Sequence, residues 1–352
     1  MPTLWLFDIE PHEQRYTSEW KTYLPQQLQS AMQKRSTQNW VLKIVSGHQT
    51  SGSLSTGGFL NFAETNRYKA EQVAEFSKRV SENKVQQGDR LLFADAWHPG
   101  IIHARYMSDL MNLRLKIHSM WHAGSYDRAD FLGRMVTDKK WSSNFERALF
   151  RASDRNYFAT KFHRDLFLKT LAPGHDDRAK VVGWPMEYLT NLISKHDDIA
   201  KKKLILFPHR MAPEKQPSIF SYLSTVLPEF QFVFAQDRRR TKAQYHALLA
   251  QALVVFSANK QETLGIGVYE GMLSGAIPVV PTRLSYKEIC RAWCYPGHWT
   301  RNIEAAKENG ENLACHIRSA VDVRDPRRIA ELADRVGAKF FNGSALYASV
   351  LR

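Results

Sequence analysis

Short apolar runs alternate with longer amphipathic segments along the chain. In the first half the apolar runs read TLWLFDI, NWVLKIVSG, RLLFADA, LKIHSMW and DRNYFAT. Segments with helical periodicity lie between several of them, for example SEWKTYLPQQLQSAMQKR and NRYKAEQVAEFSKRVSE. Strands that alternate with helices in this way predict a parallel sheet covered by helices on both faces.

The same alternation starts again after a stretch rich in Gly, Pro and charge near residues 172 to 187, which we interpret as a linker. Beyond it the apolar runs are KKKLILFPHR, FQFVFAQD, ALVVFSA and AIPVVPT. We expect an α/β chain of two doubly wound, Rossmann-like domains, residues 1–183 and 184–335, facing a central cleft at the carboxyl ends of both sheets. The last segment, residues 336–352, is expected to pack back on the N-terminal domain.

Length and composition agree with two compact units, since the chain has 352 residues of which 43% are apolar. No apolar run approaches the ~20 residues that span a bilayer, and the start lacks the basic region of a signal peptide. We therefore expect a cytoplasmic protein without stable membrane insertion. The three cysteines are interpreted as buried thiols in a reduced compartment, because their spacing fits no common zinc pattern.

The net charge of +14 points to an anionic partner. Nucleic acid, an acidic membrane surface and phosphorylated small molecules would all be attracted to such a protein. The alternative is that the basic residues only keep the protein soluble.

The segment QETLGIGVYEGMLSGAIPVV, residues 261–280, places two acids around a predicted helix. The helix is expected to begin near Ile266 and to end at Gly275. Its N-terminus offers free amides and the positive end of the helix dipole, which together favour anions. Glu262 precedes the helix and Glu270 lies on its first turns, so a diphosphate on the amides with a sugar on either side fits this layout. Acids near a helix start are also common without any ligand.

Glu262-Thr-Leu-Gly265 followed by Glu270 resembles the E-x7-E motif of retaining, nucleotide-sugar-dependent glycosyltransferases with the GT-B fold. The segment GMLSGAIPVV is similar to the helix and strand that follow the motif in that family. The resemblance implies that Glu262 acts at the donor sugar and that Glu270 binds the ribose. The amides implied to bind the sugar and the diphosphate are those of Thr263, Leu264, Gly265 and Ile266.

A basic pair follows the first strand of the second half, in FPHRMAPEKQP. Members of the same family carry such a pair for the donor diphosphate, and Arg210 and Lys215 match it. Arginine can fork two phosphate oxygens while lysine adds a point charge, which would offset the charge on a departing nucleotide. The alternative is a pair of solvated surface cations. No DxD-type signature lies in a suitable place, so we expect no metal and no cofactor other than a nucleotide-sugar co-substrate such as UDP-glucose.

The acceptor side gives weaker signals. MWHAGSYD follows a strand at a place where many relatives have a histidine that meets the donor sugar, which makes His122 a candidate, although a single histidine is more often an ordinary core or surface residue. ADAWHPG puts Asp95 at another strand end, where it could serve as a base toward the attacking hydroxyl or cap a helix. SGSLSTGGFLNF, with Gly57 and Gly58, is a candidate for the Gly-rich first loop of many relatives, which DIEPHEQRYT does not match.

Three stretches of the first half are similar to predicted bacteriophage glycosyltransferases thought to act on hydroxymethylated pyrimidines in DNA: WLFDIEPHEQRYTSEW, GGFLNFAETNRYK and HAGSYDRADFLGR. The similarity implies double-stranded DNA containing a base such as 5-hydroxymethylcytosine as the acceptor, and the host cytoplasm as the location. It agrees with the basic charge, because a duplex carries about one charge per 1.7 Å of axis. Such an enzyme must extrude the target base or open the groove.

Several residues are candidates for contacts with DNA. The aromatic side chains of Trp97, Trp121 and Tyr126 could stack on a base, although buried packing explains most of them equally well. The basic residues form two clusters that could also be solvated loops, namely Arg238, Arg239, Arg240 and Lys242, and Arg128, Arg134, Lys139 and Lys140.

Two other functions remain open. One is a peripheral-membrane glycosyltransferase for envelope glycolipids or polysaccharide, with WKTYLPQQLQSAMQKR as a basic amphipathic helix that Pro25 interrupts. The other is a non-catalytic DNA-binding protein on a GT-B scaffold. In each case we expect a monomer.

Overall fold

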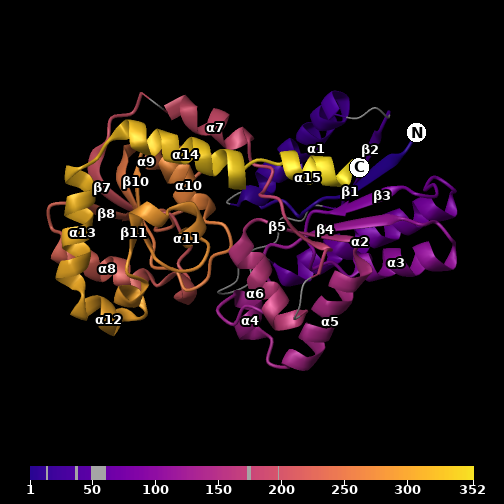
Figure 1. Ribbon diagram of the computed structural model, residues 1–352, viewed down its shortest axis with the longest axis horizontal. Coiled ribbons are helices and arrows are strands. Elements are labelled where there is room, and N and C mark those ends of the chain that lie inside the picture. The colour runs from indigo at the N-terminus through magenta and orange to yellow at the C-terminus, as the bar shows by residue number, and fades with distance from the viewer. Residues whose placement is uncertain (13–14, 36–38, 49–60, 173–175, 197) are drawn as a thin grey trace. The chain divides into compact units, whose positions relative to one another are not determined.

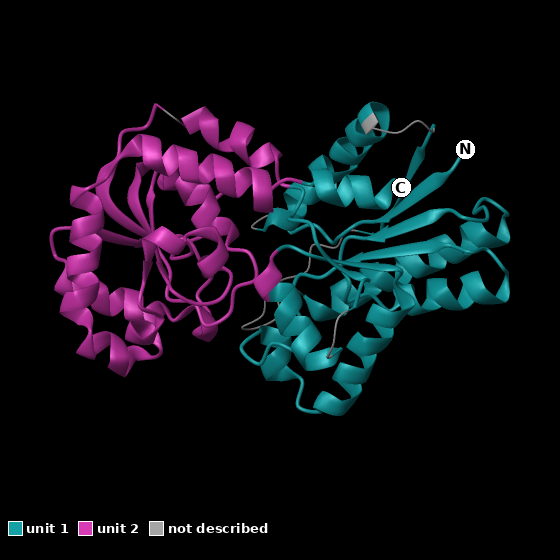
Figure 2. Ribbon diagram, in the orientation of Figure 1, with its two compact units in different colours: residues 1–159, 163–185, 343–352 teal, residues 160–162, 186–342 magenta. Residues whose placement is uncertain are grey.

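The computed structural model describes residues 1–12, 15–35, 39–48, 61–172, 176–196 and 198–352. The chain divides into two compact units (Figure 2). Unit 1 comprises residues 1–159, 163–185 and 343–352, and unit 2 comprises residues 160–162 and 186–342. Each unit is built on one parallel sheet, as the alternation of apolar and helical segments predicts.

Unit 1 has six strands in the order β2-β1-β3-β4-β5-β6 (Figure 1). Its strands are β1 (Thr3–Phe7), β2 (Val41–Val45), β3 (Arg90–Phe93), β4 (Lys116–Met120), β5 (Arg155–Phe158) and β6 (Ala179–Val181). Its helices are α1 (Tyr16–Arg35), α2 (Phe62–Ser81), α3 (Gly100–Leu110), α4 (Phe131–Met135), α5 (Lys139–Ala152), α6 (Lys161–Leu171) and α15 (Ser344–Val350). Residues Leu4 to Phe7 of β1 are all buried, so both faces of the sheet are covered.

Unit 2 has five strands in the order β11-β10-β9-β7-β8. They are β7 (Lys202–Phe207), β8 (Gln231–Phe234), β9 (Ala252–Phe256), β10 (Ile277–Pro281) and β11 (Cys294–Tyr295). The helices are α7 (Tyr188–Ile193), α8 (Pro217–Val226), α9 (Lys242–Gln251), α10 (Ile266–Leu273), α11 (Tyr286–Ile289), α12 (Ile303–Glu308), α13 (Gly310–Asp322) and α14 (Pro326–Phe340). Short 3-10 turns are η1 (Ser194–His196), η2 (Pro213–Lys215), η3 (Arg291–Trp293) and η4 (Gly297–Thr300). Val254 and Phe256 of β9 belong to a core shared with α8 and α13.

The predicted linker near 172–187 is partly wrong, because β6 lies within it and pairs with β5. This strand is only three residues long and stands among charged residues, so it lacks the apolar run that marks the other strands. The next residues are not linker-like either, since Trp184 is buried and its ring lies edge-on to that of Trp20, 6.1 Å between centroids.

Two smaller expectations also change. Pro25 lies inside α1 without interrupting it, and the apolar side chains of this helix, among them Leu24 and Leu28, are buried in unit 1. The three cysteines are free, but only Cys290 is buried and Cys315 is exposed. In the part of the chain that the structure describes, no helix is long and apolar enough to cross a membrane.

The end of the chain belongs to unit 1. Helix α15 packs against α1, and its Ser349 hydroxyl accepts a hydrogen bond from Tyr157 of β5 at 2.8 Å. Leu346 and Val350 are fully buried there, while residues 336–342 remain part of unit 2. The last ten residues therefore complete the core of a unit that begins at the N-terminus.

We expect Leu346→Ala to lower the free energy of unfolding of unit 1 by about 2–5 kcal/mol, because it removes a fully buried leucine. Leu110→Ala is the matched control, since this leucine of the same unit is 68% exposed and should change stability by less than ~0.5 kcal/mol. Urea unfolding of both variants measures the difference. Equal effects would show that α15 does not belong to the core of unit 1.

Candidate functional site

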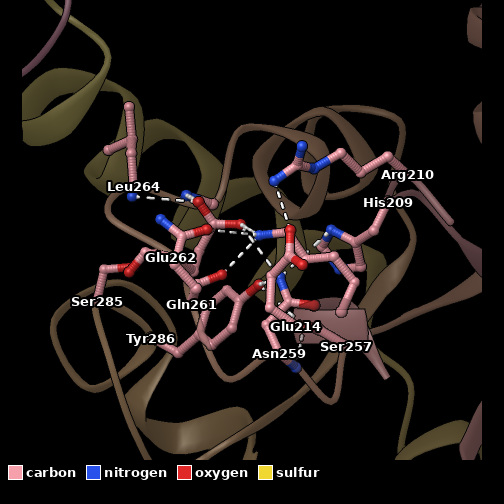
Figure 3. A network of polar contacts seen from close by, with 12 residues as sticks. His209, Arg210, Glu214, Ser257, Asn259, Gln261, Glu262, Leu264, Ser285 and Tyr286 are labelled. Atoms are coloured by element: carbon pink, nitrogen blue, oxygen red, sulfur yellow. Dashed lines mark hydrogen bonds and ion pairs between the residues drawn. The ribbon is translucent and has the colours of Figure 1, made fainter. Parts of the chain in front are cut away.

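Unit 2 brings most of the predicted donor-site residues together at the reversal of its strand order. Strand β8 lies on one side of β7 and β9 lies on the other, so the chain leaves β7 and β9 in opposite lateral directions. Ligands of doubly wound sheets bind outside the carboxyl ends of strands at such a switch point. The residues that follow these two strands, 208–215 and 257–265, form one polar network there (Figure 3).

Lys215 is the centre of this network. Its ammonium donates to the backbone carbonyl of Gln261 at 2.5 Å, and its Nζ lies 3.3 Å from Gln261 Oε1 and 3.4 Å from Glu262 Oε2. The lysine is almost completely buried. A buried ammonium is stable only with such partners, so Lys215 holds the turn that carries Glu262 in one conformation.

Glu262 folds back onto the start of α10 (Figure 3). Its Oε1 accepts hydrogen bonds from the amides of Gly265 at 3.0 Å and Leu264 at 3.4 Å, and its Oε2 accepts one from Asn259 Nδ2 at 3.2 Å. Burial alone would raise the pKa of this carboxyl, but Lys215 and the two amides outweigh burial, so its pKa lies below the ordinary value. Two of the amides predicted for a ligand are thus occupied by an ionised side chain of the protein itself.

The start of α10 depends on two glycines. Gly265 precedes the helix with a φ of 89°, a conformation that suits glycine. A Cβ at Gly267 would lie 3.0 Å from the carbonyl oxygen of Pro208, so glycine lets the helix approach the loop after β7. The positive end of the helix therefore lies close to the loop that carries Arg210. Thr263 and Ile266, whose amides were also predicted to bind a ligand, lie directly before Leu264 and directly after Gly265.

Arg210 and Glu270 both have internal partners. Arg210 forms an ion pair through Nη2 with the buried carboxylate of Glu214, although 23% of the arginine side chain is exposed. Glu270 is buried on α10, and its Oε2 accepts a hydrogen bond from the Tyr245 hydroxyl at 2.8 Å. Sequence reasoning did not find Glu214 or Asn259, which belong to no recognisable motif although they lie four and three residues from Arg210 and Glu262.

His209 adds an uncharged group beside these residues. Burial, helped by the nearby Lys215 charge, lowers the pKa of this histidine to about 3, so its imidazole is neutral. Its Nδ1 lies 3.5 Å from Asn259 Nδ2. The chemistry that this arrangement supports is anion binding by amides and guanidinium, with carboxylates that can accept hydrogen bonds from hydroxyls.

Unit 1 contains a cavity of about 360 Å³ at the corresponding place in its own sheet. Strand β2 lies on one side of β1 and β3 lies on the other, and the cavity is lined by residues just beyond β1, β3 and β4. Asp95 and His122, the two predicted acceptor-side residues, both line it. The other lining residues include Asp8, Glu10, Tyr16, Phe62, Lys69, Trp97, Leu132, Trp141 and Phe145.

Asp95 is held by Lys69, a residue that sequence reasoning missed. Lys69 Nζ lies 2.6 Å from Asp95 Oδ2, and Asp95 Oδ1 accepts a hydrogen bond from the Trp97 amide at 3.1 Å. Burial would raise the pKa of Asp95, but the Lys69 ammonium outweighs it and brings the pKa to about 2. Such a carboxylate is a weak proton acceptor at neutral pH. It closes a turn rather than capping α3, whose N-cap is Pro99 without a side-chain bond.

His122 has a partner at each ring nitrogen. Its Nε2 donates to the Ala94 carbonyl at 2.7 Å, so Nδ1 is the acceptor for the Tyr16 hydroxyl at 2.8 Å. Burial lowers the pKa of this histidine, which favours the neutral ring. The structure thus places a rigid, uncharged imidazole in the cavity wall.

The remaining candidates are distributed as follows. Trp121 and Tyr126 are buried in the core of unit 1, as the packing alternative predicts, whereas Trp97 lines the cavity. Gly57 and Gly58 lie outside the described residues. Among the described residues, no cluster of three or more His, Cys, Asp or Glu side chains could hold a metal ion. The absence of a metal requirement stays a prediction.

The two basic clusters differ. In the first, Arg238 and Arg239 are exposed, but Arg240 is 8% exposed, forms an ion pair with Asp237 and donates to the Ala235 carbonyl at 2.8 Å. The second cluster is exposed throughout and lies on and beside α4 and α5, the helices that supply Leu132, Trp141 and Phe145 to the cavity. Its members are Arg128, Arg134, Lys139 and Lys140.

Comparison with known proteins supports the fold. No protein-family model matches the chain, and no curated protein sequence matches it. Among solved structures, sucrose-phosphate synthase from Thermosynechococcus elongatus is similar with a TM-score of 0.61 and 10% identity over 99% of this chain and 98% of that one. The catalytic domain of starch synthase IV from Arabidopsis thaliana, bound to ADP and acarbose, is similar with a TM-score of 0.58 and 11% identity over 99% of both chains. WaaG, a glycosyltransferase involved in lipopolysaccharide biosynthesis, is similar with a TM-score of 0.53 and 14% identity over 99% of this chain and 98% of that one.

The chain has the GT-B fold. The fold class predicted from the alternation of strands and helices is therefore confirmed. Because each similarity covers nearly the whole of both chains, it includes both units.

We expect Asp95→Asn to destabilise the protein by about 2 kcal/mol at pH 7, because the folded-state pKa of Asp95 of about 2 lies below the ordinary value of 3.8. A lowered folded-state pKa gives stability that is present above the unfolded-state value and is lost as the pH falls through the folded-state value. The difference between wild type and variant should therefore shrink as the pH falls from about 4 to about 2. Urea unfolding at several pH values measures it, and a difference independent of pH would contradict the role of the Lys69 ion pair.

Proposed function

We propose that the protein is a glycosyltransferase that moves a hexose from a nucleotide-sugar, such as UDP-glucose, to the hydroxyl of a hydroxymethylated pyrimidine in double-stranded DNA. The donor binds to unit 2 and transfer proceeds with retention of configuration. The observation that carries the proposal is the placement of Glu262 and Glu270 on either side of the N-terminus of α10, with Arg210 on the adjoining loop. The GT-B fold supports it.

The donor diphosphate would bind to the amides at the start of α10, where a helix N-terminus favours an anion. Glu262 occupies the amides of Leu264 and Gly265 in the free protein. Two anions do not share these donors, so the diphosphate displaces the carboxylate. Once released, Glu262 can accept hydrogen bonds from the hydroxyls of the donor sugar, while Glu270 accepts those of the ribose.

Charge on the departing nucleoside diphosphate is offset by Arg210, with Lys215 nearby as a fixed positive charge. No strong protein base is required, because the leaving phosphate can take the proton of the attacking hydroxyl. This agrees with the lowered pKa of Asp95, which disfavours a role as general base. Asp95 and His122 then shape the acceptor side.

The DNA acceptor is favoured by the net charge of +14 and by the resemblance of the first half to the phage enzymes. We propose that the protein acts as a monomer in the host cytoplasm. The membrane alternative relied on the segment now seen as α1, whose apolar side chains Trp20, Leu24 and Leu28 are buried in unit 1. That helix has little apolar surface left for a lipid surface.

The test is mass spectrometry of nucleosides after the protein is incubated with DNA containing 5-hydroxymethylcytosine and a panel of nucleotide-sugars. We expect one donor to add a hexose mass to the modified nucleoside. Hydrolysis of the donor without transfer would support the enzyme and refute the DNA acceptor. No consumption of any donor, together with a salt-dependent shift of duplex DNA, would favour the non-catalytic DNA-binding protein. Flotation with anionic liposomes and no shift would favour the membrane enzyme.

We expect Glu262→Gln to bind UDP roughly ten-fold more tightly than the wild type while losing most transfer activity. Removing the charge removes the repulsion between the carboxylate and the incoming diphosphate, which is large at short range in a partly buried site. Calorimetric titration with UDP measures the first effect. Glu229→Gln, an exposed acid of unit 2 that pairs with Arg318, is the control and should bind UDP as the wild type does. Weaker UDP binding by Glu262→Gln would refute the proposal that the diphosphate displaces the Glu262 carboxylate from the amides.

We expect Glu270→Ala to weaken binding of UDP-glucose by about 10- to 150-fold, because it removes a charged acceptor of ribose hydrogen bonds. Tyr245→Phe is the matched control, since it removes the hydrogen bond to Glu270 but leaves the carboxylate in place. Its effect should be several-fold smaller. If the two variants bind UDP-glucose equally well, Glu270 does not contact the donor.

A further inference from the structure

The cavity of unit 1 has an aromatic wall. Trp97, Trp141 and Phe145 line it, with ring centroids 5.3 Å apart for Trp97–Phe145, 6.5 Å for Trp97–Trp141 and 6.3 Å for Trp141–Phe145. The indole of Trp97 is fixed by a hydrogen bond from its Nε1 to the buried carboxylate of Glu146 at 2.9 Å. Trp141 is 50% exposed, so this wall extends from the cavity to the protein surface. Aromatic side chains at such a place can stack on a planar ring.

The polar groups of the cavity disfavour an anion. Among the described residues, its lining has the carboxylates of Asp8, Glu10 and Asp95 and the cations Arg15 and Lys69. Lys21, which is not part of the lining, pairs with Asp8 at 2.5 Å. Lys69 is already engaged with Asp95 and with the Trp97 carbonyl, each at 2.6 Å. A phosphate that entered would have to compete with Asp8 and Asp95 for the lysines that already pair with these acids, and it would lose its hydration. An uncharged ring with hydrogen-bonding edges meets no such penalty.

A cluster of exposed cations lies on the helices beside the cavity. Helices α4 and α5 supply lining residues from one side and carry the second basic cluster on their exposed side, with Lys139 and Lys140 directly before Trp141 in the sequence. Exposed cations that precede a half-exposed aromatic side chain fit a polyanion whose uncharged rings can leave its backbone. The phosphates would remain on these cations while one ring enters the cavity.

We propose that the cavity of unit 1 binds the extruded pyrimidine base of the acceptor, stacked on Trp141, and that it excludes phosphorylated groups. The identity of the ring as a pyrimidine rests on the proposed function, whereas the preference for an uncharged planar ring rests on the cavity alone. Asp95, Lys69 and His122 would then face the edges of the base.

The test is binding of the free nucleoside 5-hydroxymethyl-2′-deoxycytidine, measured by equilibrium dialysis. Trp141→Ala should weaken binding about 5- to 150-fold, the range for loss of one base–aromatic stack. Tyr106→Ala is the matched control, because this tyrosine of unit 1 is 62% exposed and does not line the cavity, so binding should not change. Neither glucose 6-phosphate nor maltose, which represent a phosphorylated and an uncharged sugar acceptor, should displace the nucleoside.

Equal affinities of Trp141→Ala and wild type, or displacement by either sugar, would overturn the proposal. The proposed function can fail separately. If the wild type binds the nucleoside but adds no hexose to DNA, the binding of the base in the cavity is supported and DNA is refuted as the acceptor. If DNA is modified and Trp141→Ala keeps the wild-type kcat/KM, DNA is supported as the acceptor and the binding of the base in the unit 1 cavity is refuted.

Discussion

The candidate donor site depends on one buried cation. Lys215 has almost no contact with solvent, and within the described part of the chain its ammonium contacts the Gln261 carbonyl, the Gln261 side chain and Glu262. Lys215 lies on the loop after β7, and its acceptors lie on the turn after β9. Because a buried ammonium requires such acceptors, it holds this turn against that loop. The ionised Glu262 is thereby held at the start of α10. The amides at the positive end of this helix are thus already bound to an anion of the protein itself.

Both units have a reversal of strand order, but the residues gathered there differ in their chemistry. In each, the strand order reverses next to the first strand of the sheet, and polar residues gather where the flanking strands end. In unit 2 this place holds a helix N-terminus, Arg210 and two glutamates, which suits a charged diphosphate between hydroxyl-bearing rings. In unit 1 it holds a cavity with an aromatic wall and with lysines that already pair with acids, which suits an uncharged ring. The residues, rather than the fold, decide which ligand each unit takes.

The fold could be predicted from the sequence to a large extent, because nine of the eleven strands that the structure describes are distinct apolar runs between helical segments. The strands that were missed, β6 and β11, have three and two residues and no such run. Glu262, Glu270, Arg210 and Lys215 could be singled out by their resemblance to the motifs of a glycosyltransferase family. Their internal partners could not, because Tyr245 reaches Glu270 through tertiary packing, while Glu214 and Asn259 are near in sequence but belong to no recognisable motif. The cavity is likewise invisible in the sequence, since its walls come from segments between Asp8 and Phe145.

The most direct test of the central claim is a crystal structure of the protein with a non-hydrolysable nucleotide-sugar. The account predicts that the diphosphate lies on the amides of Leu264 and Gly265, that Glu262 has turned from these amides to the sugar hydroxyls, and that Glu270 contacts the ribose. A nucleotide-sugar bound elsewhere, with Glu262 still on its own amides and Glu270 without contact to the ligand, would contradict it.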